Sequence, residues 1–388
     1  MTNWKKDILI ITGRYLPGYK DGGPVRTIKN LTDYLGNEYN FRILTADRDH
    51  GDEAPYPDIT VNTWNRVGNA LVWYVPPGKF SFSIIRKMSE EADTVFISGC
   101  FSDYAIKTLI LNRIGQIKKP VIIAPMGLFM PNAMKRKPIK YNSFIMLFKL
   151  LGMFHNVKWS VSSEIEEKCV KKEISPEAVC YIAKDLPRMV EEKTIHKRKK
   201  TGELRAFFIS RISPEKNIIQ SIDILKECHS SIWFTIYGPI LNQQYWEKVE
   251  EKLLELPSNI HAAYKGNINS EQVVETLEQE HVFLFTTIGE NYSHVVHEAL
   301  SAGCPCVISD QTPWQDLDKN CAGHVLPLND NSRFVKAIES YAEMAETDFQ
   351  KISDAAHDYA RRVSRESAET TGYRVLFNSV KKSSNRGE

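Results

Sequence analysis

The sequence predicts an α/β protein of two Rossmann-like, doubly wound domains. Short runs of β-branched and aromatic residues alternate with helical patterns along almost the whole chain, as they do in β-α-β units. The 388 residues correspond to between two and three domains of roughly 150 residues each. Two such domains facing each other across a cleft would place ligand sites at the carboxyl ends of both sheets.

The composition excludes several classes of protein. The chain has 42% hydrophobic and 25% charged residues, which is typical of a globular protein with real cores. Its 50 Lys and Arg residues are balanced by 48 Asp and Glu residues, so we expect no nucleic-acid partner. The longest apolar run, 144–154, is too short to span a membrane, and no export signal is evident. The seven scattered cysteines predict neither disulfides nor a zinc site, and we expect a cytoplasmic protein.

The first domain is expected over residues 1–190. A hairpin is expected to be inserted there, formed by residues 59–63 and 70–75. The other strands of this domain are predicted at 7–12, 41–46, 94–98, 121–124, 158–162 and 180–183.

Residues 191–202 lack apolar periodicity and are mainly charged, so we expect a solvated linker. The alternation of strands and helices then resumes in a second domain over residues 203–365. The chain from about residue 366 to 388 is expected to be a helix that returns to the first domain. Strands of the second domain are predicted at 206–210, 232–237, 260–264, 282–286 and 306–309.

A basic loop follows the predicted strand 206–210. It reads Arg211-Ile-Ser-Pro-Glu-Lys216, in which Ser213 is a good N-cap and Pro214 a good first helical residue. The N-terminus of a helix attracts anions, and Arg211 and Lys216 add two cations. The loop therefore predicts a diphosphate site, and a capped surface helix is the alternative.

Two acids follow the predicted strand 282–286 at a spacing of eight residues. Glu290 is expected in the loop and Glu298 within the next helix. A carboxylate can accept two hydroxyl hydrogen bonds, as the vicinal hydroxyls of a ribose or hexose require. The backbone N–H groups near residues 292–294 form another anion-binding helix start. This segment suits a nucleotide sugar, although Glu298 alone is also typical of a surface acid on an amphipathic helix.

We expect no metal and no other cofactor. His294 and His297 lie beside the second acid, but their order and spacing do not fit the zinc-protease patterns, so they are interpreted as helix-surface or core residues. Two D-x-D triplets, at 47–49 and 316–318, have a spacing that can hold a divalent cation, but such triplets are common by chance. The phosphate charge already has cationic partners in the basic loop.

Paired glycines follow the first predicted strand. Gly22 and Gly23 would let the backbone approach a phosphate or sugar closely, and Pro24 suits the first turn of the next helix. The segment is not a G-x-G-x-x-G motif, so a nicotinamide-binding site is not expected. A turn that serves only chain geometry is the alternative.

A cationic loop with Lys135, Arg136 and Lys137 leads into the apolar stretch 144–154. A loop of this kind beside exposed apolar surface is how a peripheral protein binds anionic lipid, and its cations are also candidates for acceptor binding. The alternative, a buried helix preceded by solvated lysines, is the interpretation that the sequence favours.

With these motifs the chain resembles bacterial glycosyltransferases of the GT-B fold, in the large retaining family numbered four, of the "glycosyl transferases group 1" type. The first half resembles this family more loosely, and Met126 stands where many relatives have Arg. Runs in the second half are similar to members that assemble surface polysaccharides. The resemblance rests on Gly22-Gly23, Ala124-Pro-Met-Gly127, Arg211, Lys216, Tyr264-Lys-Gly266, Glu290 to Glu298, Ala302-Gly303-Cys-Pro305 and Ser309 to Trp314.

The resemblance implies a donor bound mainly by the second domain. Arg211 and Lys216 would hold the diphosphate and Glu290 the transferred sugar, as the catalytic set. Such enzymes need no metal and no protein nucleophile, and they retain the anomeric configuration. The donor-binding residues implied in addition are Glu298 at the ribose, the backbone of Asn291, Tyr292 and Ser293, Gly238, Lys265 and Gly266 near the base, and Gly22 and Gly23.

We therefore expect a retaining hexosyltransferase that uses a nucleotide-diphosphate sugar and a lipid-linked glycan acceptor in surface polysaccharide biosynthesis. It would act in the cytoplasm as a peripheral protein of the inner membrane face. Two alternatives remain open. A nucleotide-sugar epimerase of similar fold would convert the donor alone, and a non-catalytic protein would bind the donor without forming a product.

Overall fold

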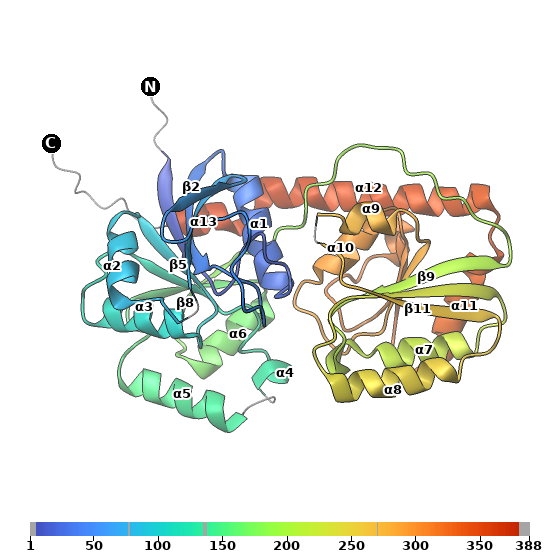
Figure 1. The fold of residues 1–388 in the computed structure, drawn as a ribbon, viewed down its shortest axis with the longest axis horizontal. Coiled ribbons are helices and arrows are strands. Elements are labelled where there is room, and N and C mark those ends of the chain that lie inside the picture. The colour runs from blue at the N-terminus through green and yellow to red at the C-terminus, as the bar shows by residue number, and fades with distance from the viewer. Residues whose placement is uncertain (1–4, 77, 135–137, 270, 380–388) are drawn as a thin grey trace. The chain divides into compact units, whose positions relative to one another are not determined.

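The computed structural model describes residues 5–76, 78–134, 138–269 and 271–379 (Figure 1). The chain divides into two compact units. The first consists of Met1–Leu186 with Ala368–Glu388, and the second of Pro187–Ser367. Within the described ranges, no helix is both long and apolar enough to cross a membrane.

The first unit contains an eight-stranded sheet with the order β3-β4-β2-β1-β5-β6-β7-β8. Neighbouring strands are parallel, except that β3 and β4 form an antiparallel hairpin. The strands are β1 (Lys6–Ile11), β2 (Tyr39–Ala46), β3 (Trp64–Val67), β4 (Ala70–Val75), β5 (Thr94–Ser98), β6 (Val121–Ala124), β7 (Val157–Val161) and β8 (Val179–Ile182).

Helices pack on both faces of this sheet, and β1 shows why. Its side chains alternate between the two faces, as in any strand. Ile8 and Ile10 belong to one core cluster, with residues of α1 and α13, while Leu9 and Ile11 belong to another, with residues of α2, α3, α5 and α6. The helices are α1 (Gly23–Leu35), α2 (Phe82–Glu90), α3 (Asp103–Arg113), α4 (Pro131–Met134), α5 (Pro138–Leu150), α6 (Glu164–Glu173) and α13 (Gly372–Asn378).

The second unit contains a six-stranded, entirely parallel sheet with the order β11-β10-β9-β12-β13-β14 around one large core cluster. The strands are β9 (Glu203–Ile209), β10 (Ser231–Tyr237), β11 (Ile260–Gly266), β12 (Val282–Phe285), β13 (Cys306–Ser309) and β14 (Gly323–Leu326). The helices are α7 (Ile218–Lys226), α8 (Gln243–Leu254), α9 (Val273–Leu277), α10 (His294–Ser301), α11 (Asn331–Glu343) and α12 (Glu346–Thr370), with two 3-10 turns, Pro214–Lys216 and Asp318–Asn320.

The predicted fold class, an α/β protein of two parallel-sheet domains, is confirmed. Most predicted strands are present with their ends shifted by a few residues. The predicted first arm of the hairpin, 59–63, is wrong because the chain pairs instead through Trp64–Val67. Gly68, with a φ of 54°, makes a tight two-residue turn that sets this register. Strand β14 was not predicted, because it has four residues and only two of them are buried.

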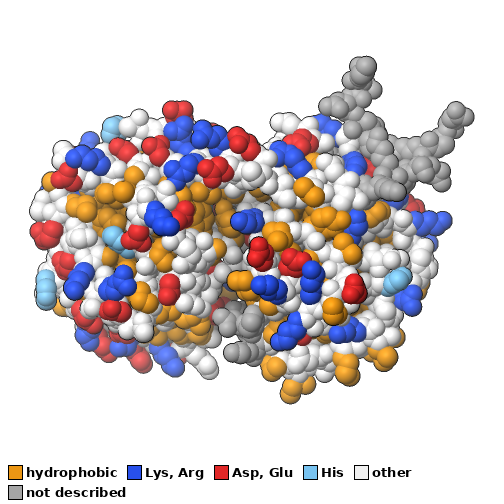
Figure 2. Space-filling model, turned by 180° about the vertical axis from the view of Figure 1, so that it is seen from behind, with side chains coloured by type: hydrophobic (Ala, Val, Ile, Leu, Met, Phe, Trp, Pro, Cys, Tyr) orange, Lys and Arg blue, Asp and Glu red, His pale blue; other side chains and the backbone are white. Residues whose placement is uncertain are grey.

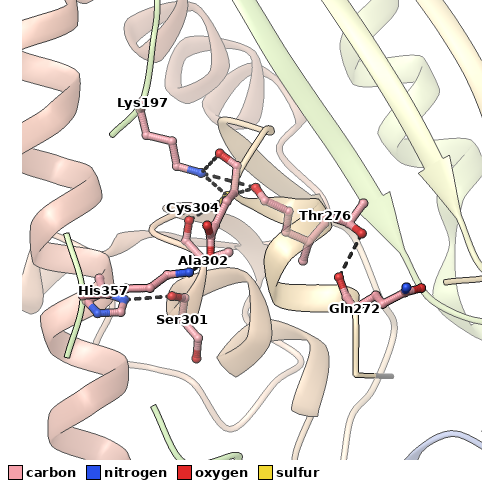
Figure 3. Close-up of polar contacts among 10 residues, drawn as sticks. Lys197, Gln272, Thr276, Ser301, Ala302, Cys304 and His357 are labelled. Atoms are coloured by element: carbon pink, nitrogen blue, oxygen red, sulfur yellow. Dashed lines mark hydrogen bonds and ion pairs between the residues drawn. The ribbon is translucent and has the colours of Figure 1, made fainter. Parts of the chain in front are cut away.

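The segment 191–202 belongs to the second unit, and the expectation that it is fully solvated is wrong. Ile195, Lys197 and Lys199 are buried, and they alternate with exposed neighbours. Lys197 Nζ donates to the carbonyl oxygens of Leu277 at 3.3 Å and Glu280 at 2.7 Å (Figure 3). Carbonyl groups at the end of a helix such as α9 lack intrahelical donors, so a lysine amine supplies what they need.

Candidate active site

Four neighbouring strands of the second sheet end beside residues that the sequence analysis selected. In the order β11, β10, β9 and β12, these strands are followed or ended by Gly266, Gly238, Arg211 and Glu290. Because all four strands are parallel, their carboxyl ends lie at the same edge of the sheet. The fold thus brings to one edge residues that are spread over 80 positions of the sequence.

The loop after β9 differs from the predicted capped helix. Ser213 makes no capping hydrogen bond, and Pro214–Lys216 form a single 3-10 turn. Asn217 then adopts a left-handed conformation with a φ of 55°, and α7 begins only at Ile218. Ser213 and Pro214 thus begin a helical turn as predicted, but the turn does not continue into a longer helix, because the left-handed backbone of Asn217 separates it from α7.

The segment between the 3-10 turn and α7 is held against the end of β12. Asn217 Nδ2 donates to the carbonyl oxygen of Thr286 at 3.0 Å, and Thr286 Oγ1 donates to the carbonyl oxygen of Asn217 at 2.8 Å. Two residues after Thr286, the N–H of Ile288 donates to the carbonyl oxygen of Glu215 at 3.1 Å. These bonds fix the two loops relative to each other. The backbone of Lys216 is therefore held in place beside the end of β12.

Lys216 and Glu290 form an ion pair at this edge. Each side chain is only 11% exposed, and Thr287 Oγ1 lies 3.2 Å from Glu290 Oε1. The backbone N–H of Glu290 donates to the carbonyl oxygen of Gln311 at 3.0 Å, which anchors the loop to the segment after β13. Charges that are largely shielded from water interact more strongly than charges on the surface. The two charged groups are therefore held in place before a ligand binds.

Arg211 lies half-buried two residues after β9. No hydrogen bond or ion pair joins its guanidinium to another part of the chain that the structure describes. A guanidinium carries five N–H donors in a planar fork that suits phosphate oxygens. Arg211 is thus the member of the predicted set whose donors remain available for a ligand.

Glu298 lies on α10 and is 4% exposed. The alternative interpretation of Glu298 as an acid on the outer surface of a helix is therefore wrong. The helix begins at His294 after Ser293, which has a left-handed backbone with a φ of 67°. The segment before it is held by Trp314, whose Nε1 donates to the carbonyl oxygen of Tyr292 at 2.7 Å. Asn291 precedes this anchored residue and is half-buried.

The two histidines of α10 are buried. His297 Nε2 lies 3.0 Å from Ser364 Oγ and 3.2 Å from the carbonyl oxygen of Ala360, so it joins α10 to α12. Burial lowers the pKa of His297 to about 4, which keeps its ring neutral near neutral pH. His294 is 8% exposed. Across the described ranges, no group of three or more His, Cys, Asp and Glu side chains has an arrangement that could hold a metal ion.

In each of the two D-x-D triplets, one carboxylate accepts hydrogen bonds from backbone N–H groups of the protein. Asp49 is buried and accepts hydrogen bonds from the backbone N–H groups of Tyr19 at 2.7 Å and Lys20 at 3.0 Å. Asp318 accepts from the backbone N–H of Val325 at 3.0 Å. Both carboxylates therefore stabilise loops.

Gly238 is required by the packing of the strand ends. Its φ is 124°, and a Cβ atom there would lie 1.8 Å from the carbonyl oxygen of Ser210. Its N–H donates to the carbonyl oxygen of Gly266 at 2.8 Å, and its own carbonyl oxygen accepts from Tyr264 Oη at 2.8 Å. Lys265, which lies between Tyr264 and Gly266 in the sequence, is exposed. The glycine is thus explained by backbone contact, and a role of this region in base binding stays a prediction.

Gly22 and Gly23 begin α1 in the first unit, with Pro24 in its first turn as predicted. Gly22 has a φ of 65°, which disfavours other residues. A Cβ atom added at either glycine would meet no described atom of the first unit within 4 Å. Within that unit the turn therefore has open space beside its backbone, as a loop that approaches a ligand requires.

Two acids in the first unit, Glu166 and Asp185, were not predicted from the sequence. Glu166 is 1% exposed and accepts from the backbone N–H groups of Gly127 at 2.6 Å and Ser162 at 2.7 Å. Burial, together with the charge of Glu166, raises the pKa of Asp185 to about 7. Asp185 follows β8 by three residues, so its place after a strand is a signal that could have selected it.

Lys135, Arg136 and Lys137 lie outside the described residues, so the structure does not place this predicted contact. The apolar stretch 144–154 that follows them is partly exposed, because Met146, Leu147, Leu150 and Leu151 face solvent. The interpretation of this stretch as a fully buried helix is therefore wrong.

Comparisons with known proteins agree with this architecture. Residues 190–360 match the sequence profile of the family described as "Glycosyl transferases group 1". No curated protein sequence matches the chain.

Solved structures share the fold over nearly the whole chain. HepE of Anabaena, solved in complex with UDP and glucose, superposes with a TM-score of 0.67 at 13% identity, covering 97% of this chain and 100% of HepE. WaaG, a glycosyltransferase involved in lipopolysaccharide biosynthesis, gives a TM-score of 0.62 at 13% identity and covers 93% of this chain and 98% of its own. Sucrose-phosphate synthase from Thermosynechococcus elongatus gives 0.67 at 14% identity, with 97% and 100% covered. The chain has the GT-B fold, and residues 190–360 carry the sequence pattern of the glycosyl transferases group 1 family.

Proposed function

We propose that the protein is a glycosyltransferase that moves a hexose from a nucleotide-diphosphate sugar to an acceptor, with retention of the anomeric configuration. The observation that carries this proposal is the Lys216–Glu290 ion pair at the carboxyl edge of the second sheet. An ammonium group suits a phosphate, and a carboxylate suits the hydroxyl groups of a sugar. The side chains of Lys216 and Glu290 are in contact. A phosphate and the sugar bonded directly to it are adjacent in the same way, so each could be bound by one of these two side chains in this proposal.

The residues around this pair supply the rest of a donor site. The free guanidinium of Arg211 joins Lys216 in neutralising the diphosphate, and the carboxylate of Glu290 accepts hydrogen bonds from the transferred sugar. Glu298 binds the ribose. The backbone N–H groups of residues 291–293 face the diphosphate at the start of α10.

The main catalytic contribution in this proposal is electrostatic. As the bond between the sugar and the diphosphate breaks, negative charge grows on the leaving phosphate, and the cations of Arg211 and Lys216 stabilise it. The leaving phosphate helps to deprotonate the acceptor hydroxyl on the same face of the sugar. The hydroxyl oxygen then forms the new bond to the anomeric carbon, and no protein nucleophile and no metal take part.

We propose a lipid-linked glycan of surface polysaccharide biosynthesis as the acceptor, and the inner face of the cell membrane as the place of the reaction. Support for a nucleotide-sugar donor comes from the UDP and glucose bound by HepE. Support for the acceptor class comes from WaaG, which takes part in lipopolysaccharide biosynthesis.

The proposal is tested by incubating the purified protein with a panel of UDP-, GDP- and dTDP-hexoses, with and without membrane lipid extract. We expect at least one donor to raise the melting temperature, because a ligand that binds the folded state stabilises it. We also expect that donor to give a nucleoside diphosphate and an acceptor-bound sugar of unchanged anomeric configuration by NMR. An epimerised donor without acceptor would support an epimerase instead, and binding without any product would support a non-catalytic protein.

A matched pair of variants locates the activity. Glu290→Gln removes the carboxylate charge of the proposed site, and we expect it to lower turnover by on the order of a hundredfold or more. Glu255→Gln removes an acid that is 47% exposed and paired with Lys226 in the same unit, and we expect no loss. Equal activity of both variants would overturn the assignment of Glu290.

A further inference from the structure

A patch of exposed apolar residues on the first unit has no role in the site described above. On α5, Ile139 is 82%, Met146 71% and Leu150 84% exposed. Figure 2 shows apolar side chains gathered at the lower right of the view, where α5 lies after the rotation from Figure 1. The bond from Arg113 Nε to the carbonyl oxygen of Leu151, at 3.0 Å, brings the end of α3 to the same patch. The α5 patch is defined as Ile114, Ile139, Met146, Leu147, Leu150 and Leu151.

The α5 patch is the outer side of a helix whose inner side is apolar as well. At about 100° per residue, Ile139, Met146 and Leu150 project from one side of α5. Ile145 and Phe148, which are buried, project from the opposite side. A helix on the surface of a soluble domain normally turns a polar side to water. The outer side of α5 therefore fits contact with another apolar phase.

The charge of the surrounding sequence is one-sided. Between Asp103 and Glu164 the sequence contains ten Lys and Arg residues and no Asp or Glu, whereas the rest of the chain has 40 Lys and Arg against 48 acids. Two of these lysines, Lys140 and Lys149, lie on α5 and are exposed. At about 100° per residue they flank the exposed apolar side, one on each side. Long lysine side chains in this arrangement reach phosphate groups while their stems cover apolar surface.

Apolar residues flanked by positive charges favour one of two possible partners of the α5 patch, a second copy of the chain or a lipid bilayer. A second copy of the chain would bring like charges together around the apolar contact, which disfavours it. An anionic lipid bilayer offers acyl chains to the patch and phosphates to the flanking lysines at the same time.

We propose that the α5 patch is a membrane-binding surface that inserts into the boundary between head groups and acyl chains of an anionic bilayer, with Lys140 and Lys149 at the lipid phosphates. This inference does not require the proposed glycosyl transfer, because vesicle binding is measured without donor or acceptor.

The experiment is flotation of the full chain with vesicles of phosphatidylcholine alone or mixed with phosphatidylglycerol. We expect binding to the mixed vesicles at low salt, and loss of much of it at high salt. We expect Leu150→Ser to weaken binding on the order of tenfold, the loss for one inserted leucine. The matched control is Leu254→Ser, at an 88% exposed position of the second unit, which we expect to bind as the wild type.

The charge contribution is tested in the same assay. Lys140→Gln should weaken binding to the mixed vesicles by roughly fivefold, the effect of one cation near an anionic surface. Lys336→Gln, an exposed position of α11, removes the same charge from the second unit and should have no effect.

Three outcomes would overturn the proposal. One is no flotation of the wild type with anionic vesicles, and another is equal loss in Leu150→Ser and Leu254→Ser. The third is a wild-type dimer in solution that Leu150→Ser converts to a monomer, which would assign the patch to a second copy. Unchanged melting temperatures of both leucine variants show that the fold is intact, as expected for exposed positions.

Discussion

Two glycines with positive φ, Gly238 in the second unit and Gly22 in the first, occupy loops that follow strands, but for different reasons. A Cβ atom at Gly238 would lie 1.8 Å from a backbone oxygen, whereas one at Gly22 would meet no described atom of the first unit within 4 Å. At Gly238 the carboxyl edge of the second sheet is therefore packed against the end of β9, while the turn in the first unit has open space beside it within that unit. A packed edge keeps charged groups such as Lys216 in place before a ligand arrives, which is what electrostatic catalysis requires.

The largest effect that tests this comparison is expected for Gly238→Ala. Its Cβ atom would collide with the backbone of Ser210, so we expect a loss of roughly 3 kcal/mol or more in the free energy of unfolding. Gly266→Ala is the control, because Gly266 has a φ of 73° but no described atom within 4 Å of an added Cβ, and its strain costs about 1 kcal/mol. Urea unfolding of the full chain measures both. Equal losses would mean that this edge is not packed.

The next effect concerns the buried ion pair. We expect Lys216→Met to lower the free energy of unfolding by roughly 2–3 kcal/mol, because Glu290 is then left as an unpaired charge with little access to water. Lys226→Met breaks a pair whose side chains are 46% and 47% exposed, and should cost less than about 1 kcal/mol. The double variant with Lys216→Met and Glu290→Gln should recover part of the loss. A loss for Lys216→Met no greater than that for Lys226→Met would contradict a pre-organised pair.

A smaller effect appears in the pH dependence of the two units, with opposite signs. His281 and His297 in the second unit have pKa values lowered to about 4 by burial. Unfolded histidines take up protons below about pH 6.5, so the second unit loses stability as the pH falls from about 6.5 to 4. Asp185 in the first unit has a pKa raised to about 7 by burial. The folded form keeps a proton that the unfolded chain releases near pH 4, so this contribution is lost as the pH rises from about 4 to 7.

Melting curves of Asp185→Asn between pH 4 and pH 8 check this expectation. The variant should melt at a higher temperature than the wild type at pH 8, because it no longer carries an acid whose surroundings favour the protonated form. At pH 4 the two should melt alike. The exposed Asp58 gives the control Asp58→Asn. If Asp185→Asn and the wild type had the same melting temperature at pH 8, the environment of Asp185 would not favour its neutral form.

The smallest change in stability is expected for Gly23→Ala. Gly23 has no positive φ, and no described atom of the first unit lies within 4 Å of an added Cβ, so the free energy of unfolding should change by less than about 0.5 kcal/mol. If the open space receives part of the substrate, kcat/KM should still fall, on the order of tenfold for a misplacement of the ligand. A steady-state assay with a donor identified by the donor screen measures kcat/KM. Wild-type kinetics would leave the open space without a role in substrate binding.

Much of the site followed from sequence because the signals were local. Alternation of strands and helices predicts parallel sheets, and the carboxyl ends of neighbouring parallel strands share one edge. This is why Arg211 and Glu290 could be assigned to one site although 79 positions separate them. The turn at Gly22 and Pro24 was also predicted, since glycine and proline restrict the backbone through their own covalent structure.

Tertiary contacts decided the rest. Nothing local predicts that Asn217 adopts a left-handed backbone, because its hydrogen bonds reach Thr286, 69 residues away. The sequence alone determined the fold class and the edge at which the charged residues gather, through periodicity and strand direction. Only the tertiary structure decided that Lys216 contacts Glu290, that Lys197 is buried and that α5 exposes an apolar side, because burial depends on which distant segments pack against a residue.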